Sequence, residues 1–327
     1  MKKIIEIKKF LGLFGLLVLI YLVYRIGFKE IVSTFIGLKI YFLLTGLPFL
    51  FLCFVIWSYR LKYLLDKKKF NLSFSYIFKI YFIGNFYSTV TPSQIGGVVM
   101  KTFYIKEKAS KTFAQTAGVV VLDKILEIIA LLFFGIIGSF ILFKYLSIKL
   151  FIMAILMFIS FILVLILLIK KKWGEIFFRL AYKFIISQNI KKKAKLSFKA
   201  FYQDLPTGRV LVLPLILAIL GWLILYSFTY FLGLSLEIKI SYLIFIVIMA
   251  ISSLVGLLPI SFGGLGTREG TTVFLLGIFN VGINQAFTLS ILGYLIAKFL
   301  PALVGSILTL VIKNDKQKSK KDISNFA

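Results

Sequence analysis

The sequence predicts an all-α integral membrane protein, and three observations lead to this fold class. Residues of the set Ala, Val, Ile, Leu, Met, Phe, Trp, Tyr and Cys make up 60% of the 327-residue chain, whereas soluble domains contain about 45–50% even when glycine is counted. Charged residues supply only 16%, against roughly 25% in soluble domains. The apolar residues also gather in runs of about 20, the length that a helix needs to cross a bilayer.

Six of these runs are expected to be full spans. They are Phe10–Phe28, Ile40–Tyr59, Thr112–Phe143, Ile148–Ile169, Val210–Leu236 and Asn284–Ile312. The first run follows four lysines, as in a signal peptide, but no small-x-small cleavage site comes after it. We therefore expect a retained first helix with a cytoplasmic N-terminus.

Two further apolar stretches, Leu72–Lys111 and Ile240–Ile283, are interrupted by proline and glycine. The interruptions are Thr91–Gly97 and Pro259–Gly266. Proline removes a backbone donor and glycine frees the backbone dihedrals, so each interruption should unwind a helix at membrane depth. Unwound backbone is tolerated there only where it is buried in protein or lines a wet cavity. We therefore expect two re-entrant helical hairpins broken at their tips, and about eight hydrophobic helical segments in all.

The distribution of basic residues favours hairpins over single crossings. If each interrupted stretch returns to its own side, 29 of the 39 Lys and Arg residues are cytoplasmic, as the positive-inside rule requires. This count assigns Arg60–Lys69 and the basic loop 170–209 to the cytoplasm. The net charge of +27 then reflects membrane orientation, and no nucleic-acid partner is expected. We predict a multi-pass protein of the cell membrane with both termini cytoplasmic.

The predicted order of segments suggests an inverted repeat. Residues 1–143 and 144–312 each read helix, helix, broken hairpin, helix, but the first unit starts inside and the second outside. The basic loop 170–209 holds an amphipathic segment, Trp173–Ile190, that suits either the membrane surface or a soluble linker, and 313–327 form a polar cytoplasmic tail. Paired breaks in inverted repeats are typical of the substrate site of a transporter. The alternative is that any two halves of a multispanning chain look alike.

Composition excludes several chemistries. The chain has no histidine and a single cysteine, Cys53, so histidine-based catalysis, disulfides and zinc clusters are ruled out. No cofactor or metal is expected.

Six charged residues fall inside the predicted membrane segments. They are Asp123, Lys124, Glu127, Arg268, Glu269 and Lys298. An ionised side chain at the bilayer centre costs roughly 2.5–3.5 kcal/mol, so we expect these charges to be paired. The spacing of Asp123 and Glu127 places both on one helix face, and we predict that Arg268 or Lys298 lies between them while Lys124 meets Glu269. Such a network could serve lipid binding or proton coupling, or it could only lock helices together.

The glycine-rich breaks suggest a phosphate site. Glycines expose backbone N–H groups, and the second break leads into the first turn of a helix that carries Arg268; a helix N-terminus with an adjacent arginine suits a phosphate. Close helix packing is the alternative use of such glycines. The candidate substrate-binding residues are Pro92, Gln94, Gly96, Gly97, Lys101, Pro259, Gly263, Gly264, Gly266 and Arg268.

These residues resemble the transmembrane region of lysylphosphatidylglycerol synthases and its stand-alone, flippase-like relatives in bacteria and archaea. The resemblance covers nearly the whole chain. It rests on Thr91–Gly97, Lys101, Val121–Glu127, Pro259–Gly270, Tyr294 and Lys298–Pro301. The family usually has Glu-Arg where this chain has Asp123-Lys124, and Arg in place of Lys101 and Lys298. Lysine keeps the charge but lacks the planar fork of arginine, so bidentate phosphate contact is reduced at those positions.

The resemblance implies a protein that moves or presents a lipid with a charged or sugar-bearing headgroup. The full-length synthases carry a soluble domain that transfers lysine from aminoacyl-tRNA, and only a short tail follows Ile312 here, so we expect no lysine transfer. The first hypothesis is a flippase-like lipid transporter that binds a phospholipid or a polyprenyl-phosphate-linked lipid. The alternatives are a membrane enzyme of lipid modification, with Asp123 and Glu127 as an acid–base pair, and an accessory subunit of a separate synthase or glycosyltransferase.

Overall fold

The structure is a computed structural model, and it describes residues 36–91, 94–145, 208–257 and 266–311, with Ser33, Ile155 and Ile159. These residues form eight α-helices and no β-strand, so the predicted all-α class is confirmed. Several predicted features lie outside the described residues. They are the span Phe10–Phe28, the span Ile148–Ile169 apart from Ile155 and Ile159, the segment Trp173–Ile190, the tail 313–327, and Pro92, Pro259, Gly263 and Gly264.

Four helices are long and apolar enough to cross a membrane. They are α3 (Ile40–Asp66), α6 (Phe113–Leu142), α10 (Val212–Ser235, preceded by the 3-10 turn η2, Gly208–Leu211) and α13 (Ile283–Tyr294), which continues through the π-helical segment η4 (Leu295–Phe299) to Val311. Large apolar side chains point outward from them: Phe140 is 69% exposed and Ile307 is 61% exposed. Such surfaces suit lipid, and the protein is an integral membrane protein with several apolar helices.

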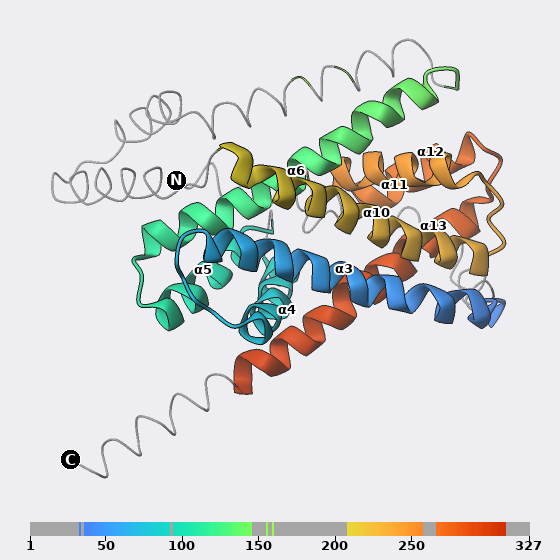
Figure 1. Cartoon of the computed structure of the whole chain (residues 1–327). Coiled ribbons are helices and arrows are strands. Elements are labelled where there is room, and N and C mark those ends of the chain that lie inside the picture. Colours follow the sequence, from blue (N-terminus) through green and yellow to red (C-terminus); the bar gives the residue numbers. More distant parts are fainter. Residues whose placement is uncertain are drawn as a thin grey trace, which may run out of the picture.

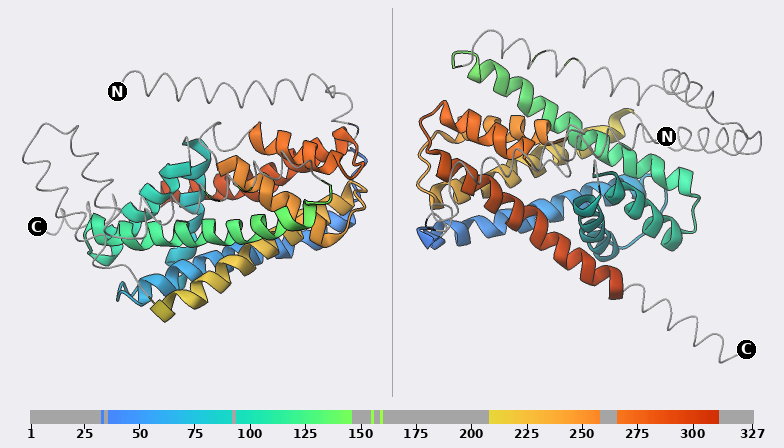
Figure 2. Two further views of the ribbon diagram at one scale, coloured as in Figure 1. Left: turned by 90° about the horizontal axis from the view of Figure 1, so that it is seen from above. Right: turned by 180° about the vertical axis from the view of Figure 1, so that it is seen from behind.

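Four shorter helices form two packed pairs. One pair is α4 (Phe74–Val90) with α5 (Ile95–Ala109), and the other is α11 (Tyr242–Leu257) with α12 (Thr267–Gly277). Each pair is joined across one of the predicted Pro/Gly interruptions. The two pairs lie toward opposite ends of the bundle, with the long helices running between them (Figures 1 and 2).

The long helices α3 and α10 lie side by side along one face of the bundle (Figures 1 and 2). Glycine allows this contact, since a Cβ atom on Gly221 would lie 2.3 Å from Nε1 of Trp57. At one end of the pair Lys39 Nζ lies 2.7 Å from Glu237 Oε1, and this hydrogen bond lowers the pKa of the Glu237 carboxyl. Apolar side chains fully buried among α3, α6, α10 and α11 form the core. They include Leu61, Leu64, Val119, Leu131, Phe228 and Ile248.

The last long helix widens at η4. The N–H of Leu300 bonds the carbonyl of Leu295, five residues earlier, as in a π-helix. Pro301 follows at once, and its ring would clash with the carbonyl four residues earlier in a regular α-helix. The carbonyl of Lys298 accepts a 2.9 Å hydrogen bond from Asn85 Nδ2 of α4. Widened turns of this kind often occur at functional sites, and this one carries a charged residue.

Candidate functional site

A cavity of about 170 Å³ lies between helices of the two halves of the chain. Its walls come from α3, α4, α5, α6, α10, α11, α12 and the end of α13 with η4. Gln94, in the first interruption, and Leu257, the last residue of α11 before the second, both line it. Residues next to both breaks therefore meet at one cavity.

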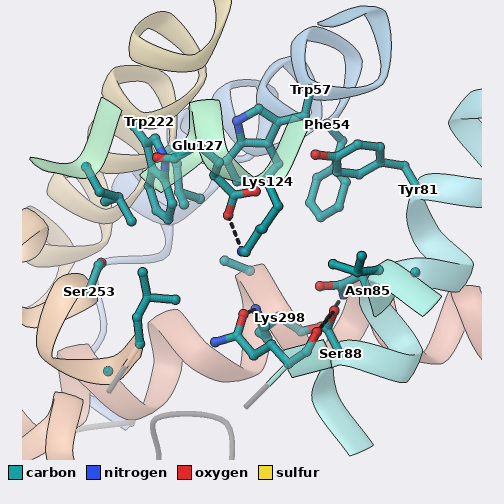
Figure 3. A pocket seen from close by; sticks show the side chains of 18 of the residues that line it. Phe54, Trp57, Tyr81, Asn85, Ser88, Lys124, Glu127, Trp222, Ser253 and Lys298 are labelled. Carbon is teal, nitrogen blue, oxygen red and sulfur yellow. Dashed lines mark hydrogen bonds and ion pairs between the residues drawn. The ribbon is translucent and has the colours of Figure 1, made fainter. Parts of the chain in front are cut away.

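The charges that line this cavity are mostly positive. Four cations and one carboxylate are among its lining residues: Lys101, Lys124, Arg268, Lys298 and Glu127. Figure 3 shows Lys124 and Glu127 projecting from one wall toward the wall that carries Lys298. Because they come from α5, α6, α12 and η4, the cations belong to both halves of the chain.

Arg60 is the main partner of Asp123, and the predicted pairing of Asp123 is wrong. Nε of Arg60 lies 2.7 Å from Oδ1 of Asp123, and both side chains are 0% exposed. The guanidinium also lies 3.8 Å from Glu127 Oε2 and donates to the hydroxyl of Tyr81 at 3.3 Å. Arg60 therefore occupies the place between the two carboxylates that Arg268 or Lys298 was predicted to fill. Lys101 Nζ approaches the other oxygen of Asp123 at 3.5 Å.

Sequence reasoning missed Arg60 because it was assigned to a cytoplasmic loop. Helix α3 instead continues to Asp66 and carries Arg60 on its buried side. The available signal was helical spacing: Leu61, Leu64 and Leu65 continue the apolar face of the helix beyond Tyr59. The charged residues Arg60 and Lys62, on either side of Leu61, interrupt the apolar run and concealed the pattern.

Lys124 pairs with Glu127, not with Glu269 as predicted. Nζ of Lys124 lies 2.7 Å from Glu127 Oε1, three residues along α6. The backbone carbonyl of Glu127 accepts a 3.2 Å hydrogen bond from Trp222 Nε1. Glu127 is thus held by α3, by α6 itself and by α10, while its carboxylate reaches the cavity.

Glu269 caps the N-terminus of α12 and forms an ion pair with the neighbouring Arg268. Its Oε2 accepts from the N–H of Gly266 at 2.6 Å, and its Oε1 accepts from Arg268 Nη2 at 2.6 Å. Arg268 Nη2 also donates to the carbonyl of Ser290 at 3.2 Å, and the guanidinium lies 4.9 Å from the ring centre of Tyr294. The Gly266 N–H, one of the donors predicted for a phosphate, is therefore taken by the protein's own carboxylate, while Gly263 and Gly264 lie outside the described residues.

Lys298 has no carboxylate within ion-pair distance in the described part of the chain. Its Nζ donates to the side-chain oxygen of Gln94 at 3.3 Å. Gln94 adopts a left-handed conformation (φ 55°) just before α5, which presents its side chain to the last helix. A lysine that lines a cavity with only an amide oxygen for a partner is suited to bind an anion.

The glycines of the first break serve packing. The N–H of Gly96 donates to Thr91 Oγ1 at 3.0 Å. This N–H was predicted to be exposed for a ligand, but it already has a partner. A Cβ on Gly97 would lie 1.9 Å from Ser88 Oγ and 2.4 Å from the carbonyl of Gly84. Neither glycine lines the cavity, whereas Gln94, Lys101 and Arg268 do. Close helix packing, the alternative use of such glycines, describes both residues.

Aromatic rings form a continuous part of the cavity wall (Figure 3). The ring centroids of Trp57 and Trp222 are 5.6 Å apart, and Trp57 also contacts Phe54 and Tyr81 at 5.7 and 6.3 Å. Lys101 Nζ lies 4.4 Å above the Tyr81 ring. The wall therefore offers an apolar face beside the cations.

The proposed acid–base pair finds no geometric support. Asp123 does not line the cavity and is enclosed by Arg60 and Lys101, so its carboxylate has no access to a substrate in the cavity. Among the described residues, no group of three or more acidic or cysteine side chains could hold a metal ion.

The fold and the cavity define a multispanning integral membrane protein with a buried, cation-rich cavity between its two halves. Residues 9–305 match the model of the family described as lysylphosphatidylglycerol synthase TM region, and the chain therefore belongs to this family. The resemblance predicted from the motifs is confirmed.

Relatives in archaea extend over most of the chain. A UPF0104 membrane protein of Pyrococcus horikoshii is 27% identical over 337 residues, covering 94% of this chain and 98% of the relative. A UPF0104 membrane protein of Methanocaldococcus jannaschii is 24% identical and covers 90% of this chain and 92% of its own length. A second one from the same organism is 26% identical and covers 72% and 98%.

Proposed function

We propose that the protein binds a lipid with a phosphate-bearing headgroup and moves it between the leaflets of the cell membrane. The observation that carries this proposal is the charge imbalance at the cavity, where Lys298 lacks an acidic partner among the described residues. An unpaired charge at membrane depth costs roughly 2.5–3.5 kcal/mol. An anionic headgroup would offset that cost, because it would supply the missing partner.

We also infer that the cavity lies at the interface of an inverted repeat, built from six full spans and two broken hairpins with both termini cytoplasmic. The spacing around the two breaks supports this. Pro92 precedes Lys101 by nine residues and Pro259 precedes Arg268 by nine residues, with a Gly-Gly pair at the same place between them. The location of the α4–α5 and α11–α12 pairs at opposite ends of the bundle agrees with hairpins that enter from opposite leaflets (Figure 2).

The two cations also have matching surroundings. Lys101 contacts Asp123, and Arg268 contacts the carbonyl of Ser290; in both cases the partner follows 22 residues later. Each cation lies over a glycine of the preceding helix, since a Cβ on Gly84 would meet the stem of Lys101 and a Cβ on Gly256 would meet that of Arg268. Matching surroundings of this kind support the inference of two repeats around one cavity.

A reconstitution experiment tests the proposal. The purified protein is placed in liposomes that contain a trace of fluorescently labelled phospholipid, and the fraction of probe reached by an impermeant reductant is followed with time. We expect the protein to raise this fraction above one half, while Lys298→Gln should reduce the rate. The matched control is Lys79→Gln, which removes an exposed lysine of α4 outside the cavity. Equal rates for liposomes with and without protein, for every phosphate-bearing lipid tested, would refute the function.

A further inference from the structure

We infer that the group accepted by the cavity is a terminal phosphate monoester, which is a dianion, rather than a phosphodiester or an aminoacylated headgroup. This inference rests on the proposed function and deepens it, because it names the charge of the headgroup. It follows from how the buried charges of the described residues balance and where the excess is located.

The network of buried and half-buried charged side chains contains five cations and three carboxylates. They are Arg60, Lys101, Lys124, Arg268 and Lys298 on one side, and Asp123, Glu127 and Glu269 on the other. All three carboxylates are already within ion-pair distance of a cation, and both Asp123 and Glu127 are shared between cations. The network therefore has an excess of two positive charges in the described part of the chain.

The excess is located at the cavity surface. Arg60 and Asp123 are both fully buried behind the wall and neutralise each other at 2.7 Å. Glu269 is also fully buried, and it faces Arg268. The cations that line the cavity come from α5, α6, α12 and η4, and Glu127 is the one carboxylate among the described lining residues. A ligand in this cavity thus meets cations carried by four different segments of the chain.

Charge matching selects among headgroups. A phosphate monoester carries about −1.5 to −2 charges at pH 7 and has three strong acceptor oxygens, which matches an excess of two. A phosphodiester carries one negative charge and leaves one cation unpaired. A zwitterionic headgroup neutralises none, and a lysyl-ester headgroup adds positive charge that the lining cations would repel.

The size of the cavity agrees with a compact group. Its volume of about 170 Å³ is below the roughly 300–1,000 Å³ of pockets that enclose drug-sized ligands. The side chain of Gln94 and the hydroxyl of Ser88 lie beside the cations as neutral polar groups. A phosphate fits among them, whereas an extended oligosaccharide does not.

The test compares lipids that differ only in the headgroup. The full-length protein, purified in detergent, is titrated with dioleoyl phosphatidic acid, dioleoyl phosphatidylglycerol, dioleoyl phosphatidylcholine and lysyl-phosphatidylglycerol, and bound lipid is counted by native mass spectrometry. We expect the monoester to bind roughly tenfold tighter than the diester, because its second negative charge makes a charge-assisted contact with the cation that the diester leaves unpaired. The order of the other two should be the zwitterion, then the lysyl ester.

A variant and a soluble phosphate separate the possible outcomes. Lys298→Gln lowers the excess to one charge and should narrow the preference for the monoester, while Lys79→Gln should leave it unchanged. Equal binding of monoester and diester, or tightest binding of the lysyl ester, would overturn the inference and leave the proposed function standing. If inorganic phosphate competes as strongly as the lipid monoester, the dianion site is supported but the lipid function fails. If no phosphate lipid binds, both fail.

Discussion

Arg60 Nε lies 2.7 Å from Asp123 Oδ1, and the two side chains join α3 to α6 without any exposure to solvent. Buried ion pairs contribute little net stability compared with apolar residues of similar size, but removal of one partner leaves an uncompensated buried charge. Loss of one partner should therefore destabilise the protein much more than replacement of both partners by apolar residues.

The variant Arg60→Met should lower the free energy of unfolding by about 3–5 kcal/mol, because Asp123 then keeps only the more distant Lys101. The double variant Arg60→Met/Asp123→Leu should recover most of this loss. Unfolding by SDS titration, followed by tryptophan fluorescence, measures both. The control is Lys62→Met on the same helix, where the partially exposed pair with Asp66 contributes about 0.3–0.5 kcal/mol. A double variant as unstable as the single one would show that the pair is not the cause.

Lys298→Gln should behave in the opposite way. Lys298 has no carboxylate partner in the described residues, so replacing it leaves no buried carboxylate unpaired. The melting temperature should therefore stay the same or rise. Lipid transport in liposomes should fall by roughly tenfold, as expected when a hydrogen bond to a charged group is lost. A variant that melts at a lower temperature and transports the remaining folded fraction normally would identify Lys298 as a structural residue.

The packing of α5 on α4 should depend on Gly97. In Gly97→Ala the new methyl group would lie 1.9 Å from Ser88 Oγ and 2.4 Å from the backbone carbonyl of Gly84, and overpacking of this kind costs typically 1–3 kcal/mol. The matched control is Gly277→Ala, where no heavy atom lies within 4 Å of the added Cβ. Melting temperatures in detergent compare the two. Similar values for both variants would mean that α4 and α5 can separate without cost.

The long helices could be predicted from the sequence because the length of an apolar run is a local property. The run Thr112–Phe143 corresponds to α6 at Phe113–Leu142, and Asn284–Ile312 corresponds to the helix Ile283–Val311. The location of both breaks could be predicted for the same reason, since proline and glycine act on their own segment of backbone. Gly96 and Gly97 nevertheless fall inside α5, because the helix restarts at Ile95.

The ion pairs between helices could not be predicted, because they depend on which helix faces meet. Asp123 and Arg60 are 63 residues apart, and no local pattern connects them. The sequence suggested three acids balanced by three bases, since Arg60 and Lys101 lie outside the uninterrupted apolar runs and were counted with the loops. Helix packing brings both to Asp123, and the balance becomes an excess of positive charge. The cavity's affinity for anions thus arises from tertiary structure.

That electrostatic preference can be measured directly with a single cysteine in the cavity. Ser253 lines the cavity, whereas the adjacent Ser252 is 1% exposed and does not. In a Cys53→Ala background, which removes the native thiol, Ser253→Cys should react with methanethiosulfonate reagents. An anionic reagent with a sulfonate group should react roughly tenfold faster than a cationic trimethylammonium reagent, relative to their rates on a small free thiol, because a site lined by one sign of charge concentrates the opposite ion.

The neighbouring Ser252→Cys should react slowly with both reagents, which controls for general opening of α11. Adding Lys298→Gln to Ser253→Cys should reduce the preference for the anionic reagent, since one of the cations facing the cavity is lost. Labelling rates from mass spectrometry of the intact protein give all of these ratios. Faster reaction with the cationic reagent at Ser253→Cys would mean that Glu127, and not the surrounding lysines, dominates the potential inside the cavity.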